Sequence, residues 1–405
     1  MTGCITFEKA PPAPGILSAL VVIYAALLPY QFEVSNAINF AVADCILVLV
    51  LLLAAGQLKY IRQNWTAWHF GIAFVFAMGS LVASLRFGKL ETYELLNKDA
   101  GLFLPFLSYA AVTSAIVDWE QIRRVLRVFV WSTVLQNLVG TAAFFAAYFF
   151  GVSNPFARYG GLRLSGMLLD PNAYGGLVVM ALIIVEGASW GAHPLLGAKA
   201  LWFSRLTLGL GILFTFSRSA WVALLLSLGL FCMLRWRVAG RMIFAGLLAA
   251  PCLLLLMGRR FVPVFETMAS RPQQVQGRFD LIQDAYAAFS QHPYFGGGLG
   301  SFRLSEGEIA HNSAMWFLAD FGIVGLAIFL GFLAWFFAKG WFAYRFAPVK
   351  EKPVALALLL GHTAMCGLAM GIEAFYQRHW WLVFGLIASA YSLTLRRVRH
   401  LPQPC

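Results

Sequence analysis

The sequence is poor in charge. Charged residues make up 12% of its 405 residues and hydrophobic residues 60%, with a mean hydropathy of +0.74. Soluble domains carry roughly 25% charged residues and under about half apolar ones. This composition cannot cover a water-facing surface, so it excludes a soluble protein. It predicts that residues 1–405 form a single integral membrane domain.

Several catalytic and metal-binding signatures are also missing. The six cysteines include no Cys-x-x-Cys pair, which argues against a metal site or a disulfide framework. The chain has no Asp-x-Asp, His-Glu-x-x-His or Gly-x-Ser-x-Gly motif, and no pair of carboxylates with clear acid/base spacing. A glycosidase-like mechanism and a metal-dependent one are therefore not supported.

Long apolar segments are abundant. A membrane-spanning helix needs roughly 20 apolar residues, and twelve segments of about this kind occur. The sequence therefore predicts an all-α polytopic bundle of about twelve transmembrane helices. The predicted spans are 15–33, 38–56, 67–85, 99–117, 128–150, 173–191, 197–216, 219–234, 241–257, 314–337, 354–371 and 379–395.

The basic residues set the orientation. Lys and Arg are retained on the cytoplasmic side of a membrane protein. With the N-terminus inside, the inner connections hold most of the 30 Lys and Arg residues. Both termini are then cytoplasmic, and the net charge of +12 needs no nucleic-acid partner.

Two external stretches interrupt the spans, at 151–172 and 258–313. Long loops are uncommon unless they are functional, so we expect chemistry in the second. Within it, residues 278–291 have the periodicity of an amphipathic helix that packs on the membrane domain or lies at the lipid interface. Its apolar stripe would consist of Phe279, Ile282, Tyr286 and Phe289.

Four external residues attract attention: Arg163, Arg218, Arg278 and His311. Each arginine alone is explained by a side chain that reaches the membrane surface. Taken together, they favour an anion site, because guanidinium groups bind phosphate oxygens in forked pairs. A histidine can serve as a general base near neutral pH, or simply as a capping residue. The combination suits displacement at a sugar carbon with a diphosphate leaving group.

Four motifs and the number of helices make the chain resemble the O-antigen ligase family, within the superfamily that also holds O-antigen polymerases and protein O-oligosaccharyltransferases. The resemblance covers nearly the whole chain and is most specific over residues 158–325. The motifs are Arg163-Leu-Ser-Gly followed by Asp170-Pro-Asn-Ala-Tyr-Gly175, Phe216-Ser-Arg-Ser-Ala-Trp221, Gly277-Arg278-Phe with Pro293 and Gly300, and His311-Asn312-Ser313.

The resemblance implies a glycosyltransferase of the bacterial cell inner membrane that acts in lipopolysaccharide biosynthesis. It implies transfer of a polysaccharide from undecaprenyl diphosphate to lipid A–core oligosaccharide on the periplasmic side, with inversion and without ATP, metal or another cofactor. By motif, Arg163, Arg218 and Arg278 would bind the donor diphosphate and His311 would be the catalytic base. Possible further residues lining the site are Arg158, Asn172, Arg378 and His379.

Other functions stay open. A repeat-unit polymerase and a protein O-oligosaccharyltransferase share these motifs, although the chain ends soon after the twelfth predicted span, which favours the ligase. A lipid-linked glycan transporter is the alternative from another class. Transporters place paired ionisable residues near mid-membrane, whereas here the polar residues gather in outer loops.

Overall fold

The computed structural model describes residues 15–35, 38–54, 65–88, 100–158, 163–168, 170–257 and 272–399. The predicted loop residues 258–271 lie outside this part. The first half of the chain forms α1 (Gly15–Leu27), β1 (Gln31–Ser35), β2 (Ile38–Ala41), α2 (Val42–Ala54), α3 (Ala67–Phe87), α4 (Ala100–Ala115), α5 (Trp119–Phe150), β3 (Ala157–Arg158), β4 (Arg163–Leu164) and α6 (Pro171–Gly187). The second half forms α7 (Ala198–Thr215), α8 (Arg218–Met257), α10 (Pro272–Gln291), α11 (Ser301–Glu306), α12 (Ser313–Phe346), α13 (Lys352–Ala369) and α14 (Arg378–Arg399).

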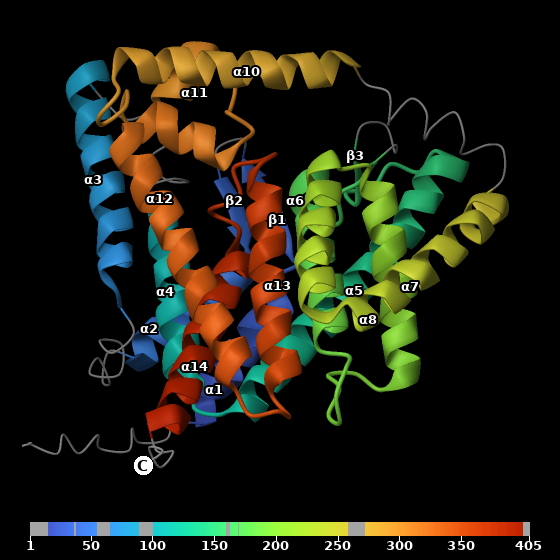
Figure 1. Cartoon of the computed structure of the whole chain (residues 1–405). Coiled ribbons are helices and arrows are strands. Elements are labelled where there is room, and N and C mark those ends of the chain that lie inside the picture. Colours follow the sequence, from blue (N-terminus) through green and yellow to red (C-terminus); the bar gives the residue numbers. More distant parts are fainter. Residues whose placement is uncertain are drawn as a thin grey trace, which may run out of the picture.

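The predicted all-α membrane fold is confirmed. Every predicted span overlaps a helix, and the helices form one bundle (Figure 1). The predicted spans 219–234 and 241–257 both lie in α8, which a kink at Arg235 (φ −148°, ψ 54°) divides into two helical segments, so the two spans are separate as predicted. The hairpins β1–β2 and β3–β4 were not predicted, because two to five residues give too short a pattern.

α6 and α13 form the centre of the bundle. Nearly every described side chain of both helices is buried, and α13 packs against α6, α8 and α12. Close approach depends on small residues: a Cβ on Gly187 of α6 would lie 2.7 Å from the Cα of Ala357 on α13. The two helices thus fix the positions of the elements around them, including the start of α8.

The outer surface of the bundle is apolar. Large hydrophobic side chains such as Leu85, Leu225 and Met233 are mostly exposed, which water would not tolerate over so large an area. Five described helices are long and apolar enough to cross a membrane: α3, α5, residues 218–244 of α8, α12 and α13. The exposed surface is therefore the lipid-facing surface of a multi-pass protein.

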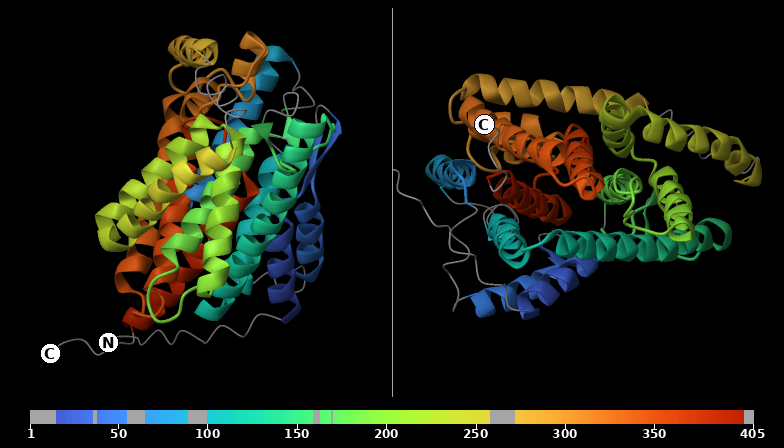
Figure 2. Two further views of the ribbon diagram at one scale, coloured as in Figure 1. Left: turned by 90° about the vertical axis from the view of Figure 1, so that its right-hand side faces the viewer. Right: turned by 60° about the horizontal axis from the view of Figure 1, so that its bottom comes forward.

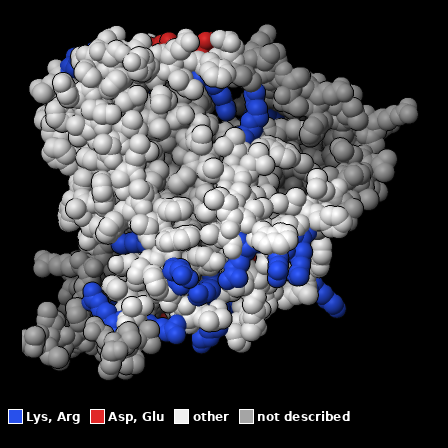
Figure 3. All heavy atoms as spheres, viewed as in Figure 1, with Lys and Arg blue, Asp and Glu red and all other residues white. Residues whose placement is uncertain are grey.

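Basic residues gather at the lower end of the bundle, as a belt of blue side chains shows (Figure 3). Some are paired. Arg123 forms an ion pair with Glu351 (2.9 Å) and donates to the carbonyl oxygen of His193 (2.7 Å). Arg205 donates to both carboxylate oxygens of the buried Glu186 (2.5 and 2.8 Å). α1 begins and α14 ends at this same end (Figures 1 and 2).

α10 lies across the upper end of the bundle, roughly perpendicular to the spans (Figure 1). It begins at Pro272, earlier than the predicted start at Arg278, and ends at Gln291 as predicted, just before His292-Pro293. Ala285 is buried against the bundle. Of the predicted stripe, Phe279, Ile282 and Tyr286 stay exposed (58%, 36% and 61%). The stripe therefore faces away from the protein core, as an interfacial helix would.

Candidate functional site

The turn between α7 and α8 presents Arg218 at the upper end of the bundle. Phe216 ends α7 in the left-handed conformation (φ 47°), and this reverses the chain within two residues. The buried Ser217 then accepts a hydrogen bond from the backbone of Ala220 (3.2 Å), as a helix-capping residue does. Arg218 is the first residue of α8 and is half-buried.

Arg163 lies beneath this turn. Its Nε donates to the carbonyl oxygen of Thr215 (2.8 Å), and its Nη2 to Asn172 Oδ1 (2.9 Å) and to the carbonyl oxygen of Phe216 (3.5 Å). The residue is 6% exposed. Arg163 therefore holds the turn to the start of α6, and the orientation of Arg218 depends on it.

Arg278 reaches the same place from α10. Its Nη1 donates to Ser219 Oγ (3.4 Å), next to Arg218. Burial lowers the pKa of Arg278, the positive charge of Arg218 lowers it further, and Asp170 acts in the opposite direction. The guanidinium stays charged, since its ordinary pKa is above about 12. Two half-buried cations that repel each other make a site whose energy an anion would lower. In Figure 3, basic side chains lie in a hollow below α10, apart from the lower belt.

His311 is fixed at the start of α12. Asn312 caps that helix, accepting from the backbone of Ala314 (2.9 Å) and Met315 (3.1 Å), and its Nδ2 donates to the carbonyl oxygen of Met370 (3.1 Å). The next residue, Gly371, packs so closely on Ser219 that a Cβ there would overlap the serine side chain. The 370–372 segment thus ties His311 to the neighbourhood of Arg218 and Arg278.

The backbone is strained at two points of this neighbourhood. Among the described residues, Phe216 (φ 47°) and His311 (φ 48°) are the two non-glycine residues with a positive φ. Such a conformation costs about 1–3 kcal/mol per residue and occurs preferentially at functional sites. Phe216 stands two residues before Arg218 and His311 is itself a predicted site residue, so the strained backbone supports this region as the candidate functional site.

The other predicted lining residues are placed differently. Arg158 lies opposite Arg163 in the backbone register of the β3–β4 hairpin. Asn172 accepts a hydrogen bond from the side chain of Arg163. Arg378 binds both carboxylate oxygens of Asp44 on α2 (2.7 and 2.6 Å). His379 is 2% exposed. Asp44 therefore holds Arg378 and the bundle core encloses His379, and the role of both residues at the site stays a prediction.

Sequence reasoning missed Asp320, which fixes the loop in front of His311. Its buried carboxylate accepts hydrogen bonds from the backbone of Gly300 (2.8 Å) and Phe302 (3.0 Å), from Ser301 Oγ (3.1 Å) and from Trp316 Nε1 (2.8 Å). A lone acid within an apolar span was the available signal, because a buried carboxylate needs several donors. Ser219 and Asp170 stand within the motifs quoted from the sequence, but neither was predicted as a site residue.

In the described part of the chain, no group of three or more His, Cys, Asp or Glu residues could hold a metal ion. The polar groups that meet at the upper end are guanidinium groups, hydroxyls, amides and one imidazole. These groups bind anions and accept or donate protons.

Fold and site together define the class: a multi-pass α-helical membrane protein with a cationic site at one membrane face. Residues 203–330 match the family model described as O-Antigen ligase, and this match over part of the chain supports the O-antigen ligase family. The matched residues run from α7 to α12 and include Arg218, Arg278 and His311, whereas Arg163 lies before them. No curated protein matches the sequence significantly.

Proposed function

We propose that the chain transfers a polysaccharide from undecaprenyl diphosphate to a sugar hydroxyl of lipid A–core oligosaccharide. The observation that carries the proposal is the convergence of Arg218, Arg278 and His311 at one end of the bundle, linked through Ser219 and residues 370–372. The family match supports a reaction of the ligase type.

The arginines would stabilise the leaving group. A diphosphate that leaves a sugar carbon gains negative charge at its bridging oxygen, and preorganised cations lower the energy of that state. Arg218 and Arg278 are half-buried and approach one another from α8 and α10. Arg163 holds the α7–α8 turn in place and so positions Arg218.

His311 would act on the acceptor. Its imidazole takes the proton of the acceptor hydroxyl as the hydroxyl oxygen forms a bond to the anomeric carbon of the donor. The bond from that carbon to the phosphate oxygen breaks, and its electron pair leaves with undecaprenyl diphosphate. Attack opposite the leaving group inverts the anomeric centre. The chain's own residues account for every proton in this scheme.

The lower end of the bundle would face the cytoplasm. Basic side chains concentrate there (Figure 3), which is the side that retains Lys and Arg. With the start of α1 and the end of α14 at that end, the arginine site would open to the periplasm of a bacterial inner membrane. A lipid-linked glycan on the outer leaflet would meet it from the membrane.

The test is transfer by the purified full chain in nanodiscs, supplied with undecaprenyl-diphosphate polysaccharide and lipid A–core. We expect the joined lipopolysaccharide as the product. Extension of the glycan on its own carrier would identify a polymerase instead. Uptake of the donor into liposomes without any new glycosidic bond would identify a transporter. Either of these outcomes overturns the proposal.

A further inference from the structure

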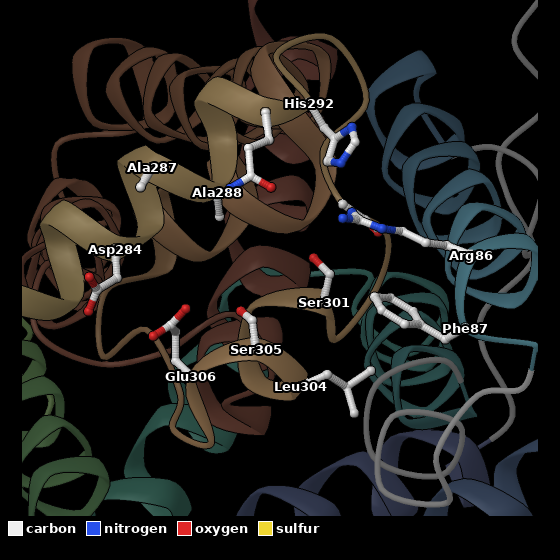
Figure 4. Close-up of a pocket in the computed structure, with 12 residues that line it drawn as sticks. Arg86, Phe87, Asp284, Ala287, Ala288, His292, Ser301, Leu304, Ser305 and Glu306 are labelled. Carbon is white, nitrogen blue, oxygen red and sulfur yellow. The ribbon is translucent and has the colours of Figure 1, made fainter.

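A cavity separate from the arginine site lies between the end of α3, α10 and α11. Its volume is about 480 Å³, within the ~300–1,000 Å³ range of small-molecule sites. Figure 4 shows the carboxylates of Asp284 and Glu306 on one side and Arg86, His292 and Phe87 on the other. None of these residues belongs to the site described above.

We propose that this cavity, called the α3–α10 pocket below, binds sugar rings of a glycan substrate without binding its phosphates. The proposal rests on the proposed function and adds a second contact for one of its two substrates. It names the hydroxyl-rich part of the glycan as the ligand, whichever substrate supplies it.

The pocket is lined by both hydrogen-bond acceptors and hydrogen-bond donors, which indicates a ligand rich in hydroxyl groups. An ionised carboxylate only accepts hydrogen bonds and a guanidinium only donates them, so Asp284 and Glu306 complement Arg86 across the cavity. A sugar hydroxyl both donates and accepts, and can satisfy both sides. A phosphate only accepts and would face two carboxylates, whose charge repels it.

An aromatic ring completes the pocket. Phe87 lines it and is 41% exposed, with the Arg86 guanidinium carbon 5.4 Å from its ring centroid. An exposed aromatic ring beside hydrogen-bonding groups suits a ligand with one apolar and one polar face. The C–H face of a sugar ring and its hydroxyl edge are such a pair.

The pocket is held in a fixed place. Arg86 Nη1 donates to the carbonyl oxygen of Gly297 (3.5 Å), which joins α3 to the loop before α11. Ser301 at the start of α11 donates to Asp320 (3.1 Å). The residues that line the pocket therefore belong to elements anchored on α12.

α10 connects the pocket to the arginine site. At about 1.5 Å per residue, Asp284 lies roughly 9 Å and Gln291 roughly 20 Å from Arg278 along the helix axis. An oligosaccharide with one end at Arg278 would reach the pocket by following α10. Occupation of the pocket would thus strengthen substrate binding without contact with the reacting atoms.

The test uses Ala287→Trp, which fills the pocket from α10, with Gln283→Trp as the matched control on an exposed position of the same helix that does not line it. Glu306→Gln removes one acceptor charge, and Glu308→Gln is its exposed control. The full chain in nanodiscs is titrated with two lipid-free probes, core oligosaccharide and donor repeat-unit oligosaccharide. Binding is followed by saturation-transfer NMR.

We expect one probe to bind the wild type, and Ala287→Trp to weaken that binding by about tenfold or more while Gln283→Trp does not. Glu306→Gln should weaken it and Glu308→Gln should not. The KM of the matching substrate should rise by a similar factor, with kcat within about twofold. The probe that binds identifies the donor or the acceptor as the source. Equal binding and KM for both Trp variants, or displacement of the probe by inorganic phosphate, would overturn the proposal.

The binding readout separates the two claims. If the wild type transfers no glycan but binds a probe that Ala287→Trp abolishes, the proposed function fails and the pocket stands. If the wild type transfers glycan and no probe binds, the pocket fails and the proposed function stands.

Discussion

At the scale of single residues, the three arginines of the site differ in what their guanidinium groups contact. Arg218 and Arg278 stand close enough to affect one another electrostatically, and a guanidinium offers a planar fork that matches two phosphate oxygens. Arg163 uses two of its nitrogen atoms on protein oxygens. The three arginines were predicted to act alike. In the structure, Arg218 and Arg278 face the site, whereas Arg163 supports the turn that carries Arg218.

Arg218→Lys should lower the transfer rate by about tenfold or more, because a point charge cannot reproduce a forked contact. The measurement is steady-state transfer in nanodiscs. Arg396→Lys is the control, since Arg396 is exposed at the lower end of α14. Wild-type rates for Arg218→Lys would remove Arg218 from the diphosphate site.

The left-handed backbone at Phe216 gives a second prediction at this scale. Phe216→Gly and Phe216→Val both remove the aromatic ring, but only glycine adopts φ 47° without strain. A β-branched residue is a severe outlier there. We expect a clearly lower thermal unfolding temperature for Phe216→Val than for Phe216→Gly, followed by tryptophan fluorescence. Equal temperatures would mean that the turn relaxes without cost.

At the scale of elements, the break in α12 shapes the upper end of the molecule. Gly322 has φ 68° and ψ −164°, a conformation open only to glycine. The break frees the carbonyl oxygens of Ala319 and Asp320, which accept from the backbone of Gly297 and Gly298 (both 3.0 Å). The loop that precedes α11 is thereby bound to α12.

Gly322→Ala should destabilise this connection by about 2 kcal/mol or more. An added Cβ would lie 2.5 Å from the carbonyl carbon of Tyr294 and 2.7 Å from the nitrogen of Gly296. Gly229→Ala is the control, because a Cβ there meets nothing within 4 Å. The thermal unfolding temperature should fall for Gly322→Ala and should stay the same or rise for Gly229→Ala. The opposite order would refute this role of the break.

Elements were the scale at which the sequence was most informative. Hydropathy located the spans because each needs its own apolar run, and the proline at 293 located the end of α10. Hydropathy also separated the two segments of α8, because the basic residues around the kink at Arg235 interrupt the apolar run. The capping role of Asn312 follows from local chemistry, whereas the donors around Asp320 come from distant positions.

At the scale of the whole molecule, the sequence predicted which end of the bundle each element lies at. It did not predict which residues from distant parts of the chain are in contact. Charge and hydropathy alone predicted that the basic residues, the start of α1 and the end of α14 lie at one end of the bundle, and that residues 278–291 form a helix at the other end. The contacts of Ser219 with Arg278 and with Gly371 were not predicted, since they join segments far apart in the chain. For the same reason Arg378 could not be separated from the cluster until its bond to Asp44 was seen.

The most direct measurement of the central claim is glycan transfer by His311→Ala, compared with His193→Ala. His193 is exposed in the α6–α7 connection at the opposite end of the bundle. The account predicts that His311→Ala remains folded and loses the joined product by about a hundredfold or more, the range expected for loss of a general base. His193→Ala should transfer like the wild type. Transfer by a folded His311→Ala at the wild-type rate would contradict the account.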